Sequence, residues 1–126
     1  MYVTDTHSFI KYLTEDKELG KAAENIFISR DNMKEIIIIP AIVLIEAMYI
    51  CEKKKTVISF DQVLEKLRIS SNYQVFPLDE RIVLVCRSMK LSDPHDRIIV
   101  ATSKLLNCPV ITKDDEIKNS RVVETI

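Results

Sequence analysis

Four acidic residues that lie far apart in the chain each stand where an apolar strand or helix is expected to begin or end: Asp5, Glu46, Asp96 and Asp114. Acids at such junctions can converge in an α/β fold. A cluster of carboxylates without neighbouring bases is the usual protein site for a hard divalent cation such as Mg²⁺. The chemistry would be that of the bound cation, which activates water and stabilises developing negative charge.

Three of these acids also have a simpler structural interpretation. Asp5 could cap the following helix, because Asp is a favoured N-cap residue, and Thr6 could do the same. Asp96 follows Asp93 by three residues, where an acid can complete a capping arrangement. Asp114 could be a turn residue after a strand. Each acid alone is weak evidence for a site, whereas the four together indicate one.

Glu46 is harder to explain as a structural residue. Its neighbours from Ala41 to Ile50 are all apolar, so no nearby residue in the sequence pairs with its carboxylate. Burial of an unpaired carboxylate is costly. Glu46 therefore points either into solvent or into a site that holds a cation, and the apolar flanks favour the second.

Composition narrows the classes of protein. The 126 residues, 47% of them apolar, fit one compact domain over residues 1–126. The net charge of −1 argues against a globally basic nucleic-acid binder, so local bases and a metal would have to hold any polyanion. Gly20 is the only glycine, which excludes the glycine-rich loops that bind nucleotides.

The cysteines and the apolar runs indicate the environment. Cys51, Cys86 and Cys108 form no zinc-binding pattern and are expected to be buried free thiols. The N-terminus has no signal-peptide pattern, and the apolar run from Ile36 to Ile45 is interrupted by Pro40 and is shorter than the roughly 20 residues of a membrane span. We expect a soluble, cytoplasmic protein.

The four acids need elements to position them, and the apolar pattern predicts strands that alternate with helices. Strands are expected at 1–4, 35–39, 73–76, 109–112 and 121–124, and helices at 6–13, 17–29, 40–52, 57–69, 79–89 and 94–106. The four isoleucines at 36–39 suggest a central parallel strand buried on both faces. We therefore predict a three-layer α/β/α sandwich with a mainly parallel sheet, in which ligands lie at the carboxyl ends of the strands.

Three short motifs in this order carry a resemblance to a known family. They are Val-Thr-Asp-Thr-His-Ser-Phe-Ile at 3–10, Leu-Ser-Asp-Pro-His-Asp-Arg-Ile-Ile-Val-Ala-Thr-Ser at 91–103, and Val-Ile-Thr-Lys-Asp at 110–114. Over its whole length the chain resembles PIN-domain ribonucleases, and most closely the VapC-type toxins of toxin–antitoxin pairs. His95 departs from the pattern, because the family often has an aromatic residue at that position.

The resemblance implies a metal-dependent endoribonuclease that uses Mg²⁺ or Mn²⁺. It assigns four catalytic acids, Asp5, Glu46, Asp96 and Asp114, and implies one or two metals and products with a 5′-phosphate. We expect Asp5, Asp96 and Asp114 to be the metal-binding residues, with Asp114 and Glu46 positioning water at the metal. Supporting roles are expected for Thr6, Thr112 and Asp93. The implied partners are an RNA substrate, a cognate antitoxin and a second copy of the chain in a homodimer.

Some basic residues stand near these acids in the sequence. Lys11, Arg97 and Lys113 are candidates for contacts to RNA phosphates, although each could equally be a solvated surface residue. Single-stranded or looped RNA is the expected substrate, because its backbone can enter a narrow crevice. His7 and His95 are expected to be loop or surface residues rather than ligands, since a hard cation prefers oxygen.

Two other functions were weighed. A non-catalytic module that binds RNA or protein on the same fold is the alternative, which the intact acids disfavour. A phosphorylated receiver-type domain would need a pair of adjacent acids after the first strand, but Asp5 is followed by Thr6 and His7.

Overall fold

A computed structural model describes all of residues 1–126, and strands alternate with helices along most of the chain. The strands are β1 (Tyr2–Thr4), β2 (Ile37–Pro40), β3 (Tyr73–Phe76) and β4 (Val110–Ile111). The helices are α1 (Thr6–Leu13), α2 (Lys21–Asp31), α3 (Ala41–Glu52), α4 (Phe60–Arg68), α5 (Glu80–Cys86), α6 (Pro94–Leu106) and α7 (Asp115–Ser120), with a short 3₁₀ helix, η1 (Lys17–Leu19). None of these helices has the length and apolar character needed to cross a membrane.

The four strands form one parallel sheet in the order β3-β2-β1-β4. The isoleucines of β2 lie in the middle of this sheet, and Ile37, Ile38 and Ile39 are all buried, which confirms the prediction of a central strand covered on both faces. Pro40 ends β2 and caps α3, so the helix starts directly at the carboxyl end of the strand.

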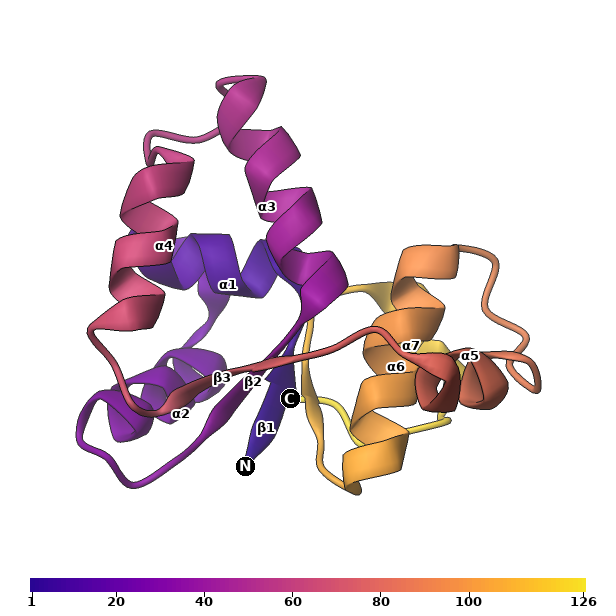
Figure 1. Ribbon diagram of the computed structural model, residues 1–126. Coiled ribbons are helices and arrows are strands. Elements are labelled where there is room, and N and C mark those ends of the chain that lie inside the picture. Colours follow the sequence, from indigo (N-terminus) through magenta and orange to yellow (C-terminus); the bar gives the residue numbers. More distant parts are fainter.

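Helices cover both faces of the sheet, as predicted (Figure 1). Helices α1, α2 and α4 lie on one side, whereas α5, α6 and α7 lie on the other. Each side has its own core. The larger core includes the fully buried Phe9, Phe27 and Val63, and the smaller core joins Ile82, Val100 and Ile117.

Two predicted helices begin later than expected. The helix predicted at 17–29 is split, because Gly20 adopts a positive φ of 88° that ends η1 before α2 begins. The helix predicted at 57–69 begins at Phe60, where Ser59 and Gln62 form a capping box. Val57 is therefore outside the helix and is 92% exposed, so its predicted place in this helix is wrong.

The C-terminal prediction is also corrected. The expected strand at 121–124 does not form, and the chain makes only an isolated bridge between Val110 and Thr125. The residues just before it form helix α7, which the sequence analysis missed. The cysteines are free, as expected, but each is only partly buried.

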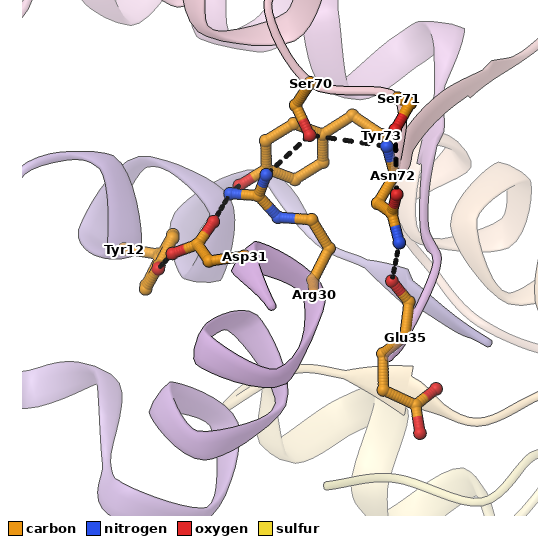
Figure 2. A network of polar contacts seen from close by, with 8 residues as sticks. All are labelled: Tyr12, Arg30, Asp31, Glu35, Ser70, Ser71, Asn72 and Tyr73. Carbon is orange, nitrogen blue, oxygen red and sulfur yellow. Dashed lines mark hydrogen bonds and ion pairs between the residues drawn. The ribbon is translucent and has the colours of Figure 1, made fainter. Parts of the chain in front are cut away.

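A polar network at the amino ends of the strands ties α2 to the start of β3 (Figure 2). The buried Arg30 donates to the Ser70 hydroxyl at 2.6 Å and to the Tyr73 hydroxyl at 3.1 Å, and it pairs with Asp31. Tyr12 donates to the same Asp31 carboxylate. Burial, then the bond to Asp31, raises the pKa of Tyr12 to about 12, and burial raises the pKa of Tyr73.

A cavity lies beside this network and not beside the four acids. It has a volume of about 720 Å³ and is lined by residues that include Tyr12, Arg30, Asp31, Ser70 and Tyr73. Tyr73 begins β3 and Arg30 of α2 contacts it, whereas Asp5, Glu46 and Asp114 follow the carboxyl ends of β1, β2 and β4, so the cavity is separate from the candidate active site.

Candidate active site

Asp5 is positioned by the end of β1. Its backbone N–H donates to the Ile111 carbonyl at 3.1 Å, which holds the ends of β1 and β4 together. Its carboxylate accepts the backbone N–H of Ser8 at 2.7 Å and so caps α1, as the capping interpretation predicted. Only 7% of Asp5 is exposed. The cap fixes the carboxylate at the carboxyl edge of the sheet.

Glu46 lies in the second turn of α3, and its two oxygens have different partners. Oε1 accepts the Thr6 hydroxyl at 2.7 Å, and Oε2 lies 3.2 Å from Nδ1 of His95. The glutamate side chain is 29% exposed. Glu46 therefore faces α1 and α6 rather than bulk solvent, and its partners come from 40 and 49 residues away in the sequence.

Asp96 lies in the first turn of α6, and its carboxylate makes no hydrogen bond within the protein. The cap of α6 is instead Asp93, which accepts the backbone N–H groups of His95 and Asp96. Burial raises the pKa of Asp96 to about 6, and the neighbouring carboxylates add to the rise: Asp114, Asp93, Glu46 and Glu116, in decreasing order. Acids from three separate parts of the sequence thus act on one carboxyl group.

Asp114 follows β4 and is the N-cap of α7. Its Oδ1 accepts the Ile117 backbone N–H at 2.9 Å, and its own N–H donates to the buried hydroxyl of Thr112 at 3.0 Å. The simple turn interpretation of Asp114 is thereby replaced by a capping one. Thr112 orients the backbone that carries Asp114.

The site is negative and has few counter-charges. None of the four acids forms an ion pair with a lysine or an arginine, and one of them, Glu46, contacts the imidazole of His95. Asp5 adjoins Thr6, which contacts Glu46. Asp114 and Glu46 both raise the pKa of Asp96, which groups these three acids. Asp5 is grouped with them through the hydrogen bond of its neighbour Thr6 to Glu46.

The donor set fits a hard cation such as Mg²⁺ or Mn²⁺. All the candidate ligands are carboxylate oxygens. The Asp96 carboxylate has no hydrogen-bond partner in the protein, and the neighbouring carboxylates oppose its ionisation. No three side chains of His, Cys, Asp or Glu stand close enough to enclose a metal by themselves. Mg²⁺ keeps several waters and is usually held by only one or two carboxylates, so a preformed cage is not required.

The basic candidates have different surroundings. Lys11 pairs with Glu18 at 3.0 Å, and Lys113 reaches over Gly20, where a methyl group on the glycine would lie 3.2 Å from Nζ. Arg97 donates through Nε to the Leu91 carbonyl and is half-buried. The lysines thus lie near η1, whereas Arg97 forms a hydrogen bond to the loop before α6.

Two residues near the acids make contacts that the sequence did not predict. His95 was expected at the surface, and its side chain is 48% exposed, but it also contacts Glu46. Glu116 accepts the backbone N–H and the hydroxyl of Ser92, at 2.7 and 2.8 Å. Both contacts join distant segments, so no local pattern predicted them, although an acid in the first turn of a helix is itself a recognisable signal for Glu116.

Comparison with known proteins gives one family and a set of similar folds. The family model described as PIN domain matches residues 2–122. A VapBC2 structure from Rickettsia felis, bound to a promoter DNA fragment, has a TM-score of 0.72 and 17% identity and covers 99% of this chain and 96% of the other. A toxin–antitoxin complex from Klebsiella pneumoniae has a TM-score of 0.70 and 16% identity, with 100% and 96% coverage.

A third structure agrees with these. The DNA-bound VapBC from Salmonella typhimurium has a TM-score of 0.69 and 17% identity, with 99% and 96% coverage. No curated protein matched the sequence. At these identities the similarity concerns the fold, and it confirms the predicted architecture.

Proposed function

Because this chain belongs to the PIN domain family, we propose that it is a metal-dependent endoribonuclease that hydrolyses RNA phosphodiester bonds. We take residues 1–126 as one PIN-like domain. The observation that carries the proposal is the half-buried Asp96, which has no basic partner and whose pKa is raised by burial and by surrounding carboxylates. A group of acids kept in mutual repulsion is typical of a site that binds a cation.

In this proposal the acids have distinct roles. Asp5, Asp96 and Asp114 would hold Mg²⁺ or Mn²⁺, which when bound activates water and neutralises charge that develops on the phosphate. Glu46 would orient the attacking water through its fixed carboxylate. Thr6 and Thr112 support these acids by hydrogen bonds to Glu46 and to the backbone of Asp114, and Asp93 supports Asp96 by capping its helix.

Two lysines are candidates for contacts to an RNA substrate. Lys113 stands next to Asp114 in the sequence, and Lys11 lies on the helix that Asp5 caps, so both could contact phosphates that flank the cleaved bond. Arg97 is the weaker candidate, because its Nε is already used by the Leu91 carbonyl. With a net charge of −1, the protein has no general attraction for polyanions, so these local charges and the metal would have to hold the RNA.

We further infer that the enzyme is the toxin of a toxin–antitoxin pair and forms a homodimer. The similar structures are toxin–antitoxin complexes, which supports a cognate antitoxin as partner. Large apolar side chains are exposed on α3 (Ile45 and Tyr49) and on α5 (Val83 and Leu84), which supports association with a second copy.

Cleavage of single-stranded RNA tests the activity. The purified protein, incubated with Mg²⁺ or Mn²⁺, should cut within the RNA and leave a 5′-phosphate, and EDTA should abolish cleavage until Mn²⁺ is added back. Cleavage that persists in EDTA, or that leaves a 2′,3′-cyclic phosphate, would contradict the proposed chemistry. Absence of cleavage on varied RNAs by the folded, metal-supplied protein would favour a non-catalytic binding module.

A further inference from the structure

The contact between His95 and Glu46 joins two residues that neither neighbour each other in the sequence nor share a helix. His95 is the second residue of α6, and its backbone N–H donates to Asp93 at 2.7 Å. This bond fixes the backbone, from which the imidazole extends to Glu46 on α3. Nδ1 lies 3.2 Å from the Glu46 carboxylate and 4.0 Å from that of Asp93, so its closer partner is Glu46.

The roles of donor and acceptor in this contact follow from the carboxylate. An ionised carboxylate can only accept hydrogen bonds, so the imidazole nitrogen that faces Glu46 has to carry the hydrogen. Thr6 likewise donates its hydroxyl to the other oxygen of Glu46. Both oxygens of Glu46 are thereby held by donors of the protein, one from α1 and one from α6.

This arrangement defines the position of the Glu46 carboxylate. Glu46 cannot become a direct ligand of a cation without sharing an oxygen that already accepts a hydrogen bond. The same two bonds prevent rotation of the carboxyl group, and one of its donors belongs to the residue next to Asp96 in the sequence. Movement of α6 and the direction of Glu46 are therefore coupled through His95.

We propose that His95 is a positioning residue of the nuclease site: its Nδ1–H holds Glu46 Oε2, so that Glu46 orients the attacking water rather than binding the metal. This inference rests on the proposed nuclease function. It concerns a histidine that stands where the resemblance led us to expect an aromatic residue. A phenyl ring could fill the same space but could not donate to Glu46, so the imidazole nitrogen is the feature that matters.

Kinetic measurements separate the nitrogen from the ring. His95→Phe keeps a ring and removes the donor, and it should lower kcat for RNA cleavage about tenfold or more while KM changes less than about twofold, the loss expected for one hydrogen bond to a charged group. His95→Asn retains a donor close to the Nδ1 position and should recover most of the lost rate. The same two substitutions at the exposed His7, the only other histidine, are the matched controls.

Three kinetic outcomes would overturn the proposal. It is wrong if His95→Phe keeps the wild-type kcat, if His95→Asn is as slow as His95→Phe, or if the loss falls on KM alone. Because the His95 side chain is 48% exposed, both variants should melt within a few degrees of the wild type, which excludes unfolding as the cause.

A spectroscopic measurement keeps the contact testable if no RNA is cleaved. With ¹⁵N-labelled histidine at a fixed alkaline pH, nitrogen chemical shifts should show His95 protonated at Nδ1, and Glu46→Met should remove this preference without changing the His7 signals. Protonation of His95 at Nε2 alone in the wild type would exclude the contact. Failure of cleavage together with the Nδ1 tautomer would reject the nuclease and retain the pairing.

Discussion

At the scale of single residues, ionisation of Asp96 is opposed by burial and by the carboxylates around it. The carboxylates of Asp5 and Asp114 each accept a hydrogen bond from a backbone N–H, because each residue caps a helix. Glu46 has two side-chain donors. Among the four carboxylates, only that of Asp96 accepts no hydrogen bond within the protein, and it is the acid for which a cation would offer the largest relief of repulsion.

The stability of the metal-free protein should therefore depend on the protonation of Asp96. Its pKa in the folded protein, about 6, lies above the ordinary value of 3.8, so the folded state binds the proton more tightly than the unfolded state. The resulting loss of stability is complete above about pH 6 and disappears as the pH falls toward 4. Urea unfolding in EDTA should show a free energy of unfolding that rises from pH 7 to pH 5.

The Asp96→Asn variant is the control for this titration. It should be more stable than the wild type at pH 7.5, and the difference between the two should shrink as the pH falls toward 4.5. A constant difference over this range would mean that Asp96 does not titrate with a raised pKa.

The four acids could be proposed as site residues from sequence because each stands near the start or end of an expected strand or helix, and these are local patterns. The partners of Glu46 could not, since Thr6 and His95 reach it only after three helices have packed together. The apolar flanks of Glu46 agree with a carboxylate that faces α1 and α6. The flanking residues do not supply the donors to the Glu46 carboxylate, which come from Thr6 and His95.

At the scale of elements, local chemistry decided which boundaries were predictable. The pair Asp93-Pro94 starts α6 as expected, because Asp accepts the free N–H groups and proline needs none. The capping box of Ser59 and Gln62 is equally local but was not recognised, which moved the predicted start of α4 by three residues. Helix α7 has only six residues, too few to show an apolar period.

Gly20 should be required between η1 and α2. A Cβ atom there would be strained at φ 88° and would lie 3.2 Å from Lys113 Nζ. Gly20→Ala should lower the free energy of unfolding by about 1–2 kcal/mol. In the Lys113→Ala background the steric part should vanish while the backbone part remains, so an unchanged stability of Gly20→Ala in both backgrounds would show that the turn is not constrained.

Arg30 should be a structural residue that joins α2 to β3. Arg30→Ala removes donors to Ser70 and Tyr73 and leaves Asp31 without its guanidinium, so unfolding should become easier by about 2–4 kcal/mol. The exposed Arg68 of α4 is a matched control, and Arg68→Ala should change stability little. Equal effects of the two substitutions in urea unfolding would mean that the network contributes nothing.

At the scale of the whole molecule, the sheet brings the carboxyl ends of β1, β2 and β4 to one edge. The alternation of strands and helices predicted a parallel sheet, but the strand order β3-β2-β1-β4 is set by long-range pairing and has no local signal. The fold was therefore predictable as a class. The expected strand ends indicated which acids could lie at the same edge of the sheet, whereas the distances between these acids depend on how α3 and α6 pack.

The exposed apolar side chains of α3 and α5 should mediate association of two copies. Ile45→Lys and Leu84→Lys place a charge where an apolar contact is expected and should each raise the dimer dissociation constant at least about fivefold, the scale of a residue that matters in an interface. Sedimentation measures this constant. Val57→Lys changes an equally apolar, 92% exposed residue outside both helices, and it should leave the constant unchanged.

If the monomer–dimer equilibrium of Val57→Lys shifted as much as those of the α3 and α5 variants, these helices would not form the interface. A wild type that stays monomeric at high concentration would exclude the homodimer altogether.

The most direct test of the acidic site compares, in one assay, a carboxylate assigned to the site with an exposed carboxylate that is not. Cleavage of single-stranded RNA in Mn²⁺ is measured for the wild type, Asp96→Asn and Asp115→Asn, where Asp115 is an exposed acid next to Asp114 that makes no hydrogen bond or ion pair through its side chain. Asp96→Asn should be slower by at least about a hundredfold, the scale of losing one positioned electrostatic group, and Asp115→Asn should match the wild type. Full cleavage by folded Asp96→Asn would contradict the proposed site.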